Sequence, residues 1–182
     1  MRIGLTALLA LALSNICSAE SFTLTSPDIK PDQALSKQQE FNGFGCNGAN
    51  QSPALQWSGL PEGTKSLALT VYDPDAPTGS GWWHWLVFNL PADTKSLPAN
   101  IDSSGKGLPN GATQSRTDFG ATGFGGACPP SGDKPHHYQF TLYALKTNKL
   151  ELNADAMPAM VGYMLHMNSL GTAQLTATYQ RK

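Results

Sequence analysis

The sequence predicts a mostly β protein, folded as a sandwich of antiparallel sheets with one helix near the C-terminus. Three observations predict this fold class. Short apolar runs with alternating or β-branched residues recur along the chain, clusters of Gly, Pro, Asn and Ser separate them, and only one long segment has helical periodicity. Strands and turns at such spacing are typical of a β-sandwich.

Five segments have the pattern of a strand. In Ser66–Tyr72, the side chains of Leu67, Leu69 and Val71 alternate with residues that face the other side of the strand. The remaining segments alternate in the same way or are rich in aromatic and branched residues: Phe22–Ser26, Trp83–Asn89, His137–Leu145 and Leu175–Gln180.

The predicted helix follows the last long loop. Apolar residues recur there at helical spacing, namely Met157, Met160, Val161, Met164 and Leu165. Asn153 or Asp155 is expected to cap the start, Pro158 fits the first turn, and Gly171 fits the end. A methionine stripe can be a ligand surface, but we interpret this one as core packing against a sheet.

The first nineteen residues have the order of a secretory signal peptide. Arg2 precedes an apolar run, and small residues follow up to Ala19. The run is too short to span a bilayer, and no later run is longer, so the sequence predicts no integral membrane protein. We expect cleavage after Ala19, export to the periplasm or beyond, and a single domain over residues 20–182.

Charge and cysteine content narrow the functional class. The formal net charge is −1 and no basic run occurs, which argues against nucleic acid as a partner. Two cysteines remain after cleavage, Cys46 and Cys128. Export to an oxidising compartment favours a disulfide between them over two free thiols.

Two long segments without periodicity are interpreted as functional loops. They are Lys37–Pro53 and Ala99–Pro135, and each contains one of the two cysteines. A Cys46–Cys128 disulfide would therefore tie the two loops together.

Residues with ionisable or hydrogen-bonding side chains lie at the ends of three predicted strands. Asp73 and Asp75 stand in a stiff loop with Pro77, directly after a strand. Side-chain alternation places Trp82 and His84 on one face of the next strand, with Trp83 and Trp85 on the other.

A glycine-rich segment completes the set. Gly126 and Cys128 lie in it, just before His136 and Tyr138, which share one strand face while His137 lies on the other. Backbone N–H groups in such a turn can bind an anion. Taken singly, each motif also fits an ordinary turn or a core histidine.

Together, three separated motifs resemble the phosphatidylethanolamine-binding protein family, in its bacterial YbhB/YbcL-type, Raf-kinase-inhibitor-like branch. They are DPDAP at 73–77, GWWHWLVFNLP at 81–91 and GGACPPSGDKPHHYQFTLYAL at 125–145, with NQSPAL at 50–55 in support. The resemblance runs from about Phe22 to the C-terminus.

The resemblance implies a Greek-key β-sandwich with a few short helices and an anion-binding pocket at one end. It implies a pocket built from Asp73, Asp75, Pro77, Trp82, His84, Gly126, Cys128, His136 and Tyr138. It also predicts a cis peptide bond between Ala76 and Pro77, as a proline-rich strand exit favours.

These observations predict a small-ligand-binding protein rather than an enzyme. The expected ligand is anionic or zwitterionic with a phosphate-like headgroup, no cofactor or metal is expected, and a protein-interaction or inhibitor role is a related possibility within the family. The alternative is a hydrolase that uses the Asp, His and Tyr side chains for acid–base work. Against the alternative, the chain has no G-x-S-x-G motif, and Cys128 loses its nucleophilicity in a disulfide.

Overall fold

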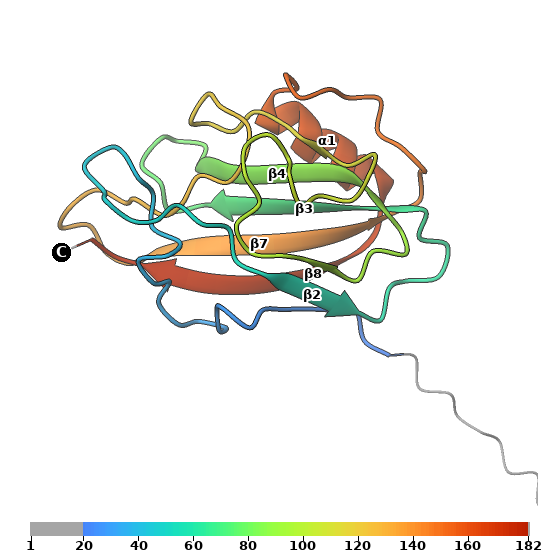
Figure 1. The fold of residues 1–182 in the computed structure, drawn as a ribbon, viewed down its shortest axis with the longest axis horizontal. Helices are drawn as coiled ribbons and strands as arrows, with labels where there is room; N and C mark the ends of the chain where they lie inside the picture. Colours follow the sequence, from blue (N-terminus) through green and yellow to red (C-terminus); the bar gives the residue numbers. More distant parts are fainter. Residues whose placement is uncertain (1–19, 182) are drawn as a thin grey trace, which may run out of the picture.

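The computed structural model describes residues 20–181, so the predicted signal peptide and its cleavage site at Ala19 lie outside the described residues. Within them the protein is mostly β, as predicted, with one α-helix near the C-terminus (Figure 1). The elements in chain order are β1 (Thr23–Thr25), β2 (Leu55–Ser58), β3 (Ser66–Asp73), β4 (Trp82–Pro91), β5 (Ser96–Leu97), β6 (Thr113–Gln114), β7 (His136–Leu145), α1 (Pro158–Asn168) and β8 (Ser169–Tyr179).

Two antiparallel sheets form the sandwich. The larger has the strand order β6-β4-β3-β7-β8, and the smaller has the order β1-β2-β5. The long strands β3, β4, β7 and β8 run side by side across the molecule (Figure 1). Strand β3 lies in the middle of the larger sheet, which explains why it is apolar on both faces.

Alternation along β3 divides the core into two layers. Leu67, Leu69 and Val71 pack between the two sheets, together with residues of β1, β2 and β5. Ala68 faces the other side, where it joins a smaller cluster with Val161 and Leu165 of α1. The helix therefore covers the face of the large sheet that the small sheet leaves open.

A β-bulge in β4 changes the predicted alternation at the site. Val71 pairs with Trp85 and Tyr72 pairs with Trp83, so His84 is an extra residue between the two pairs. Trp85 lies in the core between the sheets, whereas Trp83 packs against the cluster under α1. The prediction that Trp83 and Trp85 share a face was wrong, because the bulge shifts the alternation by one residue.

The helix forms near the predicted position but differs in its caps and its exposed face. Pro158 occupies the first turn as predicted, yet Met157 is the N-cap and makes no side-chain cap. The helix ends at Asn168, ahead of Gly171, because Ser169 already pairs with Leu145 in the sheet.

The methionine stripe is only partly core, which corrects its interpretation. Val161 and Leu165 are buried, whereas Met157 and Met160 are 60% and 48% exposed. The helix buries a narrow stripe because a single sheet face covers it.

The sequence pattern did not predict three strands: β2, β5 and β6. They are two to four residues long, which is too short for alternation of side chains to be recognised. They matter for the architecture, since β2 and β5 make two thirds of the smaller sheet. Within residues 20–181, no helix is long and apolar enough to cross a membrane.

Candidate functional site

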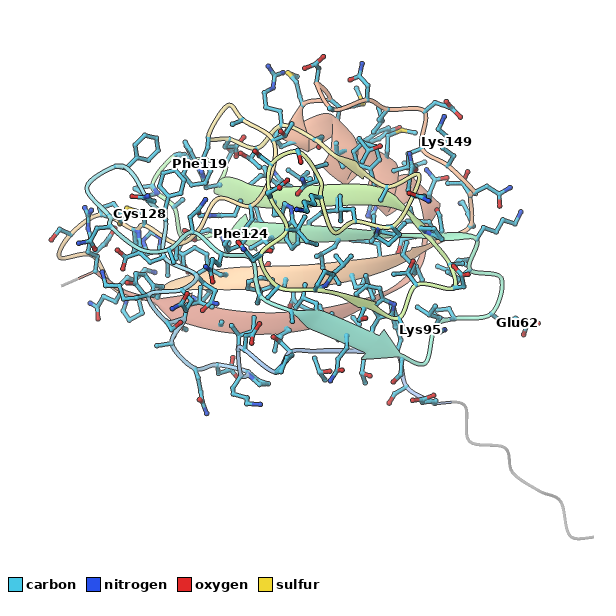
Figure 2. All side chains as sticks on the ribbon, in the orientation of Figure 1. Glu62, Lys95, Phe119, Phe124, Cys128 and Lys149 are labelled. Atoms are coloured by element: carbon cyan, nitrogen blue, oxygen red, sulfur yellow. A yellow bond between two sulfur atoms is a disulfide. The ribbon has the colours of Figure 1, made fainter. Side chains whose placement is uncertain are left out.

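The candidate site lies at one end of the large sheet, where β3 ends and where β4 and β7 begin. Because neighbouring strands are antiparallel, the end of β3 at Asp73 lies beside the start of β4 at Trp82 and near the start of β7 at His136. The loops that leave these strand ends enclose a pocket of about 170 Å³. Figure 2 shows Phe119 and Cys128 at this end of the molecule, with Glu62 and Lys95 at the opposite end.

Seven of the nine predicted site residues line this pocket: Asp73, Pro77, Trp82, His84, Cys128, His136 and Tyr138. They come from strands and loops up to 65 positions apart in the chain. The strand ends named from sequence motifs therefore converge in space.

A buried hydrogen-bonded pair, Asp73 and His136, forms the polar centre of the pocket. His136 Nδ1 lies 2.8 Å from Asp73 Oδ2, and the side chains are 1% and 3% exposed. An ionised carboxylate only accepts hydrogen bonds, so Nδ1 of His136 carries the proton and donates it. His136 Nε2 lies 3.4 Å from Oδ2 of Asp133, a residue outside the pocket lining.

Asp73 also shapes the loop that follows it. Its Oδ1 accepts hydrogen bonds from the backbone N–H groups of Asp75 and Ala76, at 2.8 and 3.2 Å. One carboxylate thus closes a turn with one oxygen and orients His136 with the other. Asp73 is therefore the direct hydrogen-bond partner of a buried histidine.

This turn contains no cis bond, which corrects the prediction for Ala76–Pro77. No peptide bond within residues 20–181 is cis. The loop instead reverses through the Asp73 turn and through a hydrogen bond from Thr78 N–H to Ala76 O at 2.8 Å. These contacts close the loop with a trans bond at Pro77.

His84 is held by the opposite wall. Its Nδ1 lies 2.7 Å from Gly125 O, and the ring is buried edge-on against Phe119 and Tyr138. Burial lowers the pKa of His84, although the bond to Gly125 and the charge of Asp73 oppose this effect. His84 is therefore neutral at pH 7, and Nδ1 is its protonated nitrogen because a carbonyl only accepts.

Two further groups add donors to the pocket wall. The Tyr138 phenol is buried, and burial raises its pKa, with a smaller contribution from Asp73, so the hydroxyl keeps its proton. Trp82 Nε1 is buried and finds no hydrogen-bond partner among the described residues. An unpaired buried N–H is costly, and an acceptor on a ligand would satisfy it.

Asp75, predicted to touch the ligand, lies outside the pocket. Its Oδ2 accepts from the backbone N–H of His137 at 2.9 Å and from Nδ1 of the same residue at 2.7 Å, while Oδ1 pairs with Lys134 Nζ at 3.3 Å. The His137 hydrogen bond lowers the pKa of Asp75 to about 2. Asp75 thus ties the loop after β3 to the segment that enters β7.

Gly126 also lies outside the pocket, and its amide is already used. The Gly126 N–H donates to Asn50 Oδ1 at 2.7 Å, and the Ala127 N–H donates to Gln39 O at 3.0 Å. A Cβ on Gly126 would lie 2.2 Å from Gln39 O, so the glycine permits close packing of two backbones. Both amides therefore already donate to protein acceptors, and neither is free to donate to an anion.

The predicted disulfide between Cys46 and Cys128 is present, with an S–S distance of 2.05 Å. Cys128 lines the pocket, so the bond joins the pocket wall to the loop that contains Cys46. Arg181 Nη1 lies 3.6 and 3.7 Å from the two sulfur atoms.

Six pocket residues were not predicted: Phe44, Ala76, Thr78, Phe119, Pro129 and Pro130. Most are apolar residues in loops, where single-sequence periodicity carries no signal. Phe44 and Phe119 are each followed by a glycine in a long loop. This Phe-Gly dipeptide was the signal in the sequence that could have identified the two residues. Within residues 20–181, no group of three or more His, Cys, Asp or Glu side chains could hold a metal ion.

Comparisons with known proteins support the family. Among curated relatives, the UPF0098 protein YbcL of Escherichia coli K12 is 56% identical over 165 residues, which cover 90% of each chain. YbhB of the same organism is 49% identical over 156 residues, covering 86% of this chain and 98% of YbhB. A Mycobacterium tuberculosis H37Rv protein named as lipoprotein LppC is 34% identical over 164 residues, covering 90% of this chain and 74% of LppC.

The crystal structure of E. coli YbcL, described as a new member of the mammalian PEBP family, has the same fold. It matches with a TM-score of 0.87 and 57% identity, covering 88% of this chain and 99% of that chain. The family model described as phosphatidylethanolamine-binding protein matches residues 25–180. This chain therefore belongs to the phosphatidylethanolamine-binding protein family.

Proposed function

We propose that this protein is an exported binding protein that takes a small anionic or zwitterionic group, such as a phosphate-like headgroup, into the pocket at Asp73 and His136. The observation that carries the proposal is the buried Asp73–His136 pair inside a small, otherwise mostly apolar pocket. A carboxylate and an imidazole that are removed from bulk water and line a pocket are typical of a binding site.

The size of the pocket supports a headgroup rather than a large ligand. Its volume of about 170 Å³ is below the roughly 300–1,000 Å³ of pockets that bury a drug-sized molecule. A phosphate or carboxylate with a few attached atoms matches this volume, and the rest of a larger ligand would extend out of the mouth.

The donors of the pocket match an anion. When His84 is protonated, its Nδ1 stays with Gly125 O, and Nε2 becomes a donor for the ligand. The Tyr138 hydroxyl and Trp82 Nε1 are further donors. Because burial lowers the pKa of His84, acidification adds a positive charge here, and anion affinity should increase as pH falls.

A zwitterion would use one more group. Both oxygens of Asp73 already accept hydrogen bonds from the protein, whereas the Asp133 side chain beside His136 Nε2 is 40% exposed. An ammonium group next to the anionic headgroup can pair with Asp133. An ammonium group of the ligand would therefore contact Asp133 rather than Asp73.

The hydrolase alternative has one observation in its favour, because a carboxylate that orients a histidine is also an acid–base arrangement. Two observations favour binding instead. Cys128 is in a disulfide and the Tyr138 phenol keeps its proton, so neither supplies a ready nucleophile. The protein-interaction role stays a prediction from the family resemblance.

Calorimetric titration with inorganic phosphate, phosphoethanolamine and acetate between pH 5.5 and 8 tests the proposal. His136→Ala should lower phosphate affinity roughly ten- to a hundredfold, because the buried Asp73 carboxylate loses its partner and repels the anion. His166→Ala is the matched control, since His166 is an exposed histidine on α1. Equal binding by wild type and His136→Ala would refute the site.

The same variants separate binding from catalysis. Turnover of 4-nitrophenyl phosphate or 4-nitrophenyl acetate that disappears in His136→Ala but persists in His166→Ala would favour the hydrolase. Binding without turnover supports the binding protein.

Export is supported by independent observations. Residues 1–19 have the order of a signal peptide, the disulfide suits an oxidising compartment, and a relative is named as a lipoprotein. Intact-mass measurement of the secreted or periplasmic protein should give a chain that begins at Glu20. A retained Met1, or a lipid on Cys17, would contradict this cleavage.

A further inference from the structure

Phe44 is held in an unusual conformation at the mouth of the pocket. Its φ angle is 52°, in the left-handed region that bulky side chains rarely adopt. Its side chain lines the pocket, yet the residue is 69% exposed, the most exposed large apolar residue of the described chain. Strained backbone and an exposed aromatic ring are both unfavourable for folding alone, which points to a role in binding.

Neighbouring contacts fix this conformation. Arg181 Nη1 donates to Phe44 O at 3.2 Å, and Gly45 follows with a φ of 83°. Two positions after Phe44, the Cys46–Cys128 disulfide anchors the chain to the pocket wall. The Phe44 ring therefore lies on a turn that these contacts hold in place.

Phe44 belongs to a group of three aromatic rings, called here the aromatic ledge: Phe41, Phe44 and Phe119. The Phe44 and Phe119 ring centroids lie 5.7 Å apart with 25° between the planes, and those of Phe41 and Phe119 lie 4.4 Å apart. Phe119 also contacts His84 inside the pocket, at 5.3 Å between ring centroids. The ledge thus continues from the buried histidine to the exposed ring of Phe44.

We propose that the aromatic ledge binds an aromatic ring that is attached to the anionic headgroup of the ligand. The inference rests on the proposed function and narrows the ligand to small acids, such as phosphate monoesters, that carry a flat aromatic substituent. The pocket has room for the headgroup only, so the next atoms of the ligand meet the mouth. The exposed ring of Phe44, which stacks on Phe119, offers an apolar aromatic surface there.

Charge also favours an aromatic substituent over a polar one. The described residues that line the pocket include four with ionisable side chains: Asp73, His84, His136 and Tyr138. None of these lining residues is a lysine or an arginine. The exposed residues of the lining include the apolar side chains of Phe44 and Pro130. A polar substituent that lies against Phe44 and Phe119, away from Asp133, would lose water and gain no partner, whereas an aromatic ring loses little.

The experiment compares two phosphate monoesters that differ in one substituent, phenyl phosphate and methyl phosphate. Calorimetric titration gives their affinity ratio for the oxidised protein and for Phe44→Ala. Wild type should favour phenyl phosphate, and Phe44→Ala should reduce that ratio roughly three- to tenfold, as loss of one aromatic contact implies. Phe44→Tyr keeps the ring and should retain the ratio.

Tyr163→Ala is the matched control. Tyr163 is an aromatic residue of α1 with 59% exposure, and it lies outside the pocket lining. This variant should show the wild-type ratio, and thermal melts of all variants verify that they are folded.

The outcomes are distinct. If methyl phosphate binds but wild type shows no preference for phenyl phosphate, or if Phe44→Ala keeps the preference, the ledge has no such role and the proposed function stands. If neither ester binds, both the proposed function and this inference fail. If sedimentation shows that Phe44→Ala changes the oligomeric state instead of the ratio, the exposed ring serves contact between copies and the inference is overturned.

Discussion

His136 Nδ1 lies 2.8 Å from Asp73 Oδ2, and this buried contact joins the start of β7 to the end of β3. The two residues are 63 positions apart, and the strands that carry them are neighbours in the large sheet. Asp73 meanwhile holds the backbone of the following loop through Oδ1. The contact therefore combines the architecture of the sheet edge with the chemistry of the pocket.

Replacing Asp73 should destabilise the fold as well as the site. In Asp73→Asn, the amide cannot offer His136 a charged acceptor, so a charge-assisted hydrogen bond is lost between two buried groups. We expect a loss of about 1.5–3 kcal/mol in the free energy of unfolding at pH 7, measured by urea denaturation. Asp93→Asn, an exposed carboxylate on a loop, is the control. Equal stability of the two variants would contradict the structural role of the pair.

Stability should depend on pH through His84. Burial lowers the pKa of folded His84 below its ordinary value of 6.5, so the unfolded chain takes up a proton first on acidification. Its contribution is fully present above about pH 6.5 and is lost as pH falls toward the folded pKa, with a slope of up to about 1.4 kcal/mol per pH unit. Denaturation between pH 7.5 and 4.5 should show this slope in wild type and in His166→Ala. A slope that persists in His84→Asn would assign it to other groups.

Asp75 should contribute at lower pH. The pKa of folded Asp75 is about 2 against an ordinary value of 3.8, mainly because of the His137 hydrogen bond. Its stabilisation is present above about pH 3.8 and is lost as pH falls through about 2. Asp75→Asn should cost about 1–2 kcal/mol at pH 7, because His137 is half exposed and solvent screens the pair. A double-mutant cycle with His137→Ala measures the coupling, and additive effects would contradict it.

The disulfide should support both the fold and the pocket. It joins residues 82 positions apart, and breaking such a bond costs about 2–5 kcal/mol. Because Cys128 lines the pocket and Cys46 follows the Phe44 turn, reduction should also weaken phosphate binding. Urea denaturation and calorimetry with and without a reductant measure the two effects. The Cys46→Ser/Cys128→Ser double variant should match the reduced protein and should not respond to the reductant.

Several parts of the fold could be predicted because they depend on local patterns. Alternation along β3 and β7 identified the residues that face each side, and the division of these residues between the two core clusters agrees with it. The same rule failed at His84, because a bulge depends on how β4 pairs with β3 and not on the sequence of β4 alone. The exposed methionines of α1 are a similar case, since the sheet beneath decides how much of the helix is covered.

For the site, the sequence by itself determined seven of the residues that line the pocket. Asp73, His84 and His136 each stand at a strand end, and antiparallel pairing brings such ends to one edge of a sheet. Only the tertiary structure decided how these groups are used. It pairs Asp73 with His136, directs Asp75 to His137, and occupies the amide of Gly126 with Asn50. Those choices depend on contacts between loops far apart in the chain, which no local pattern specifies.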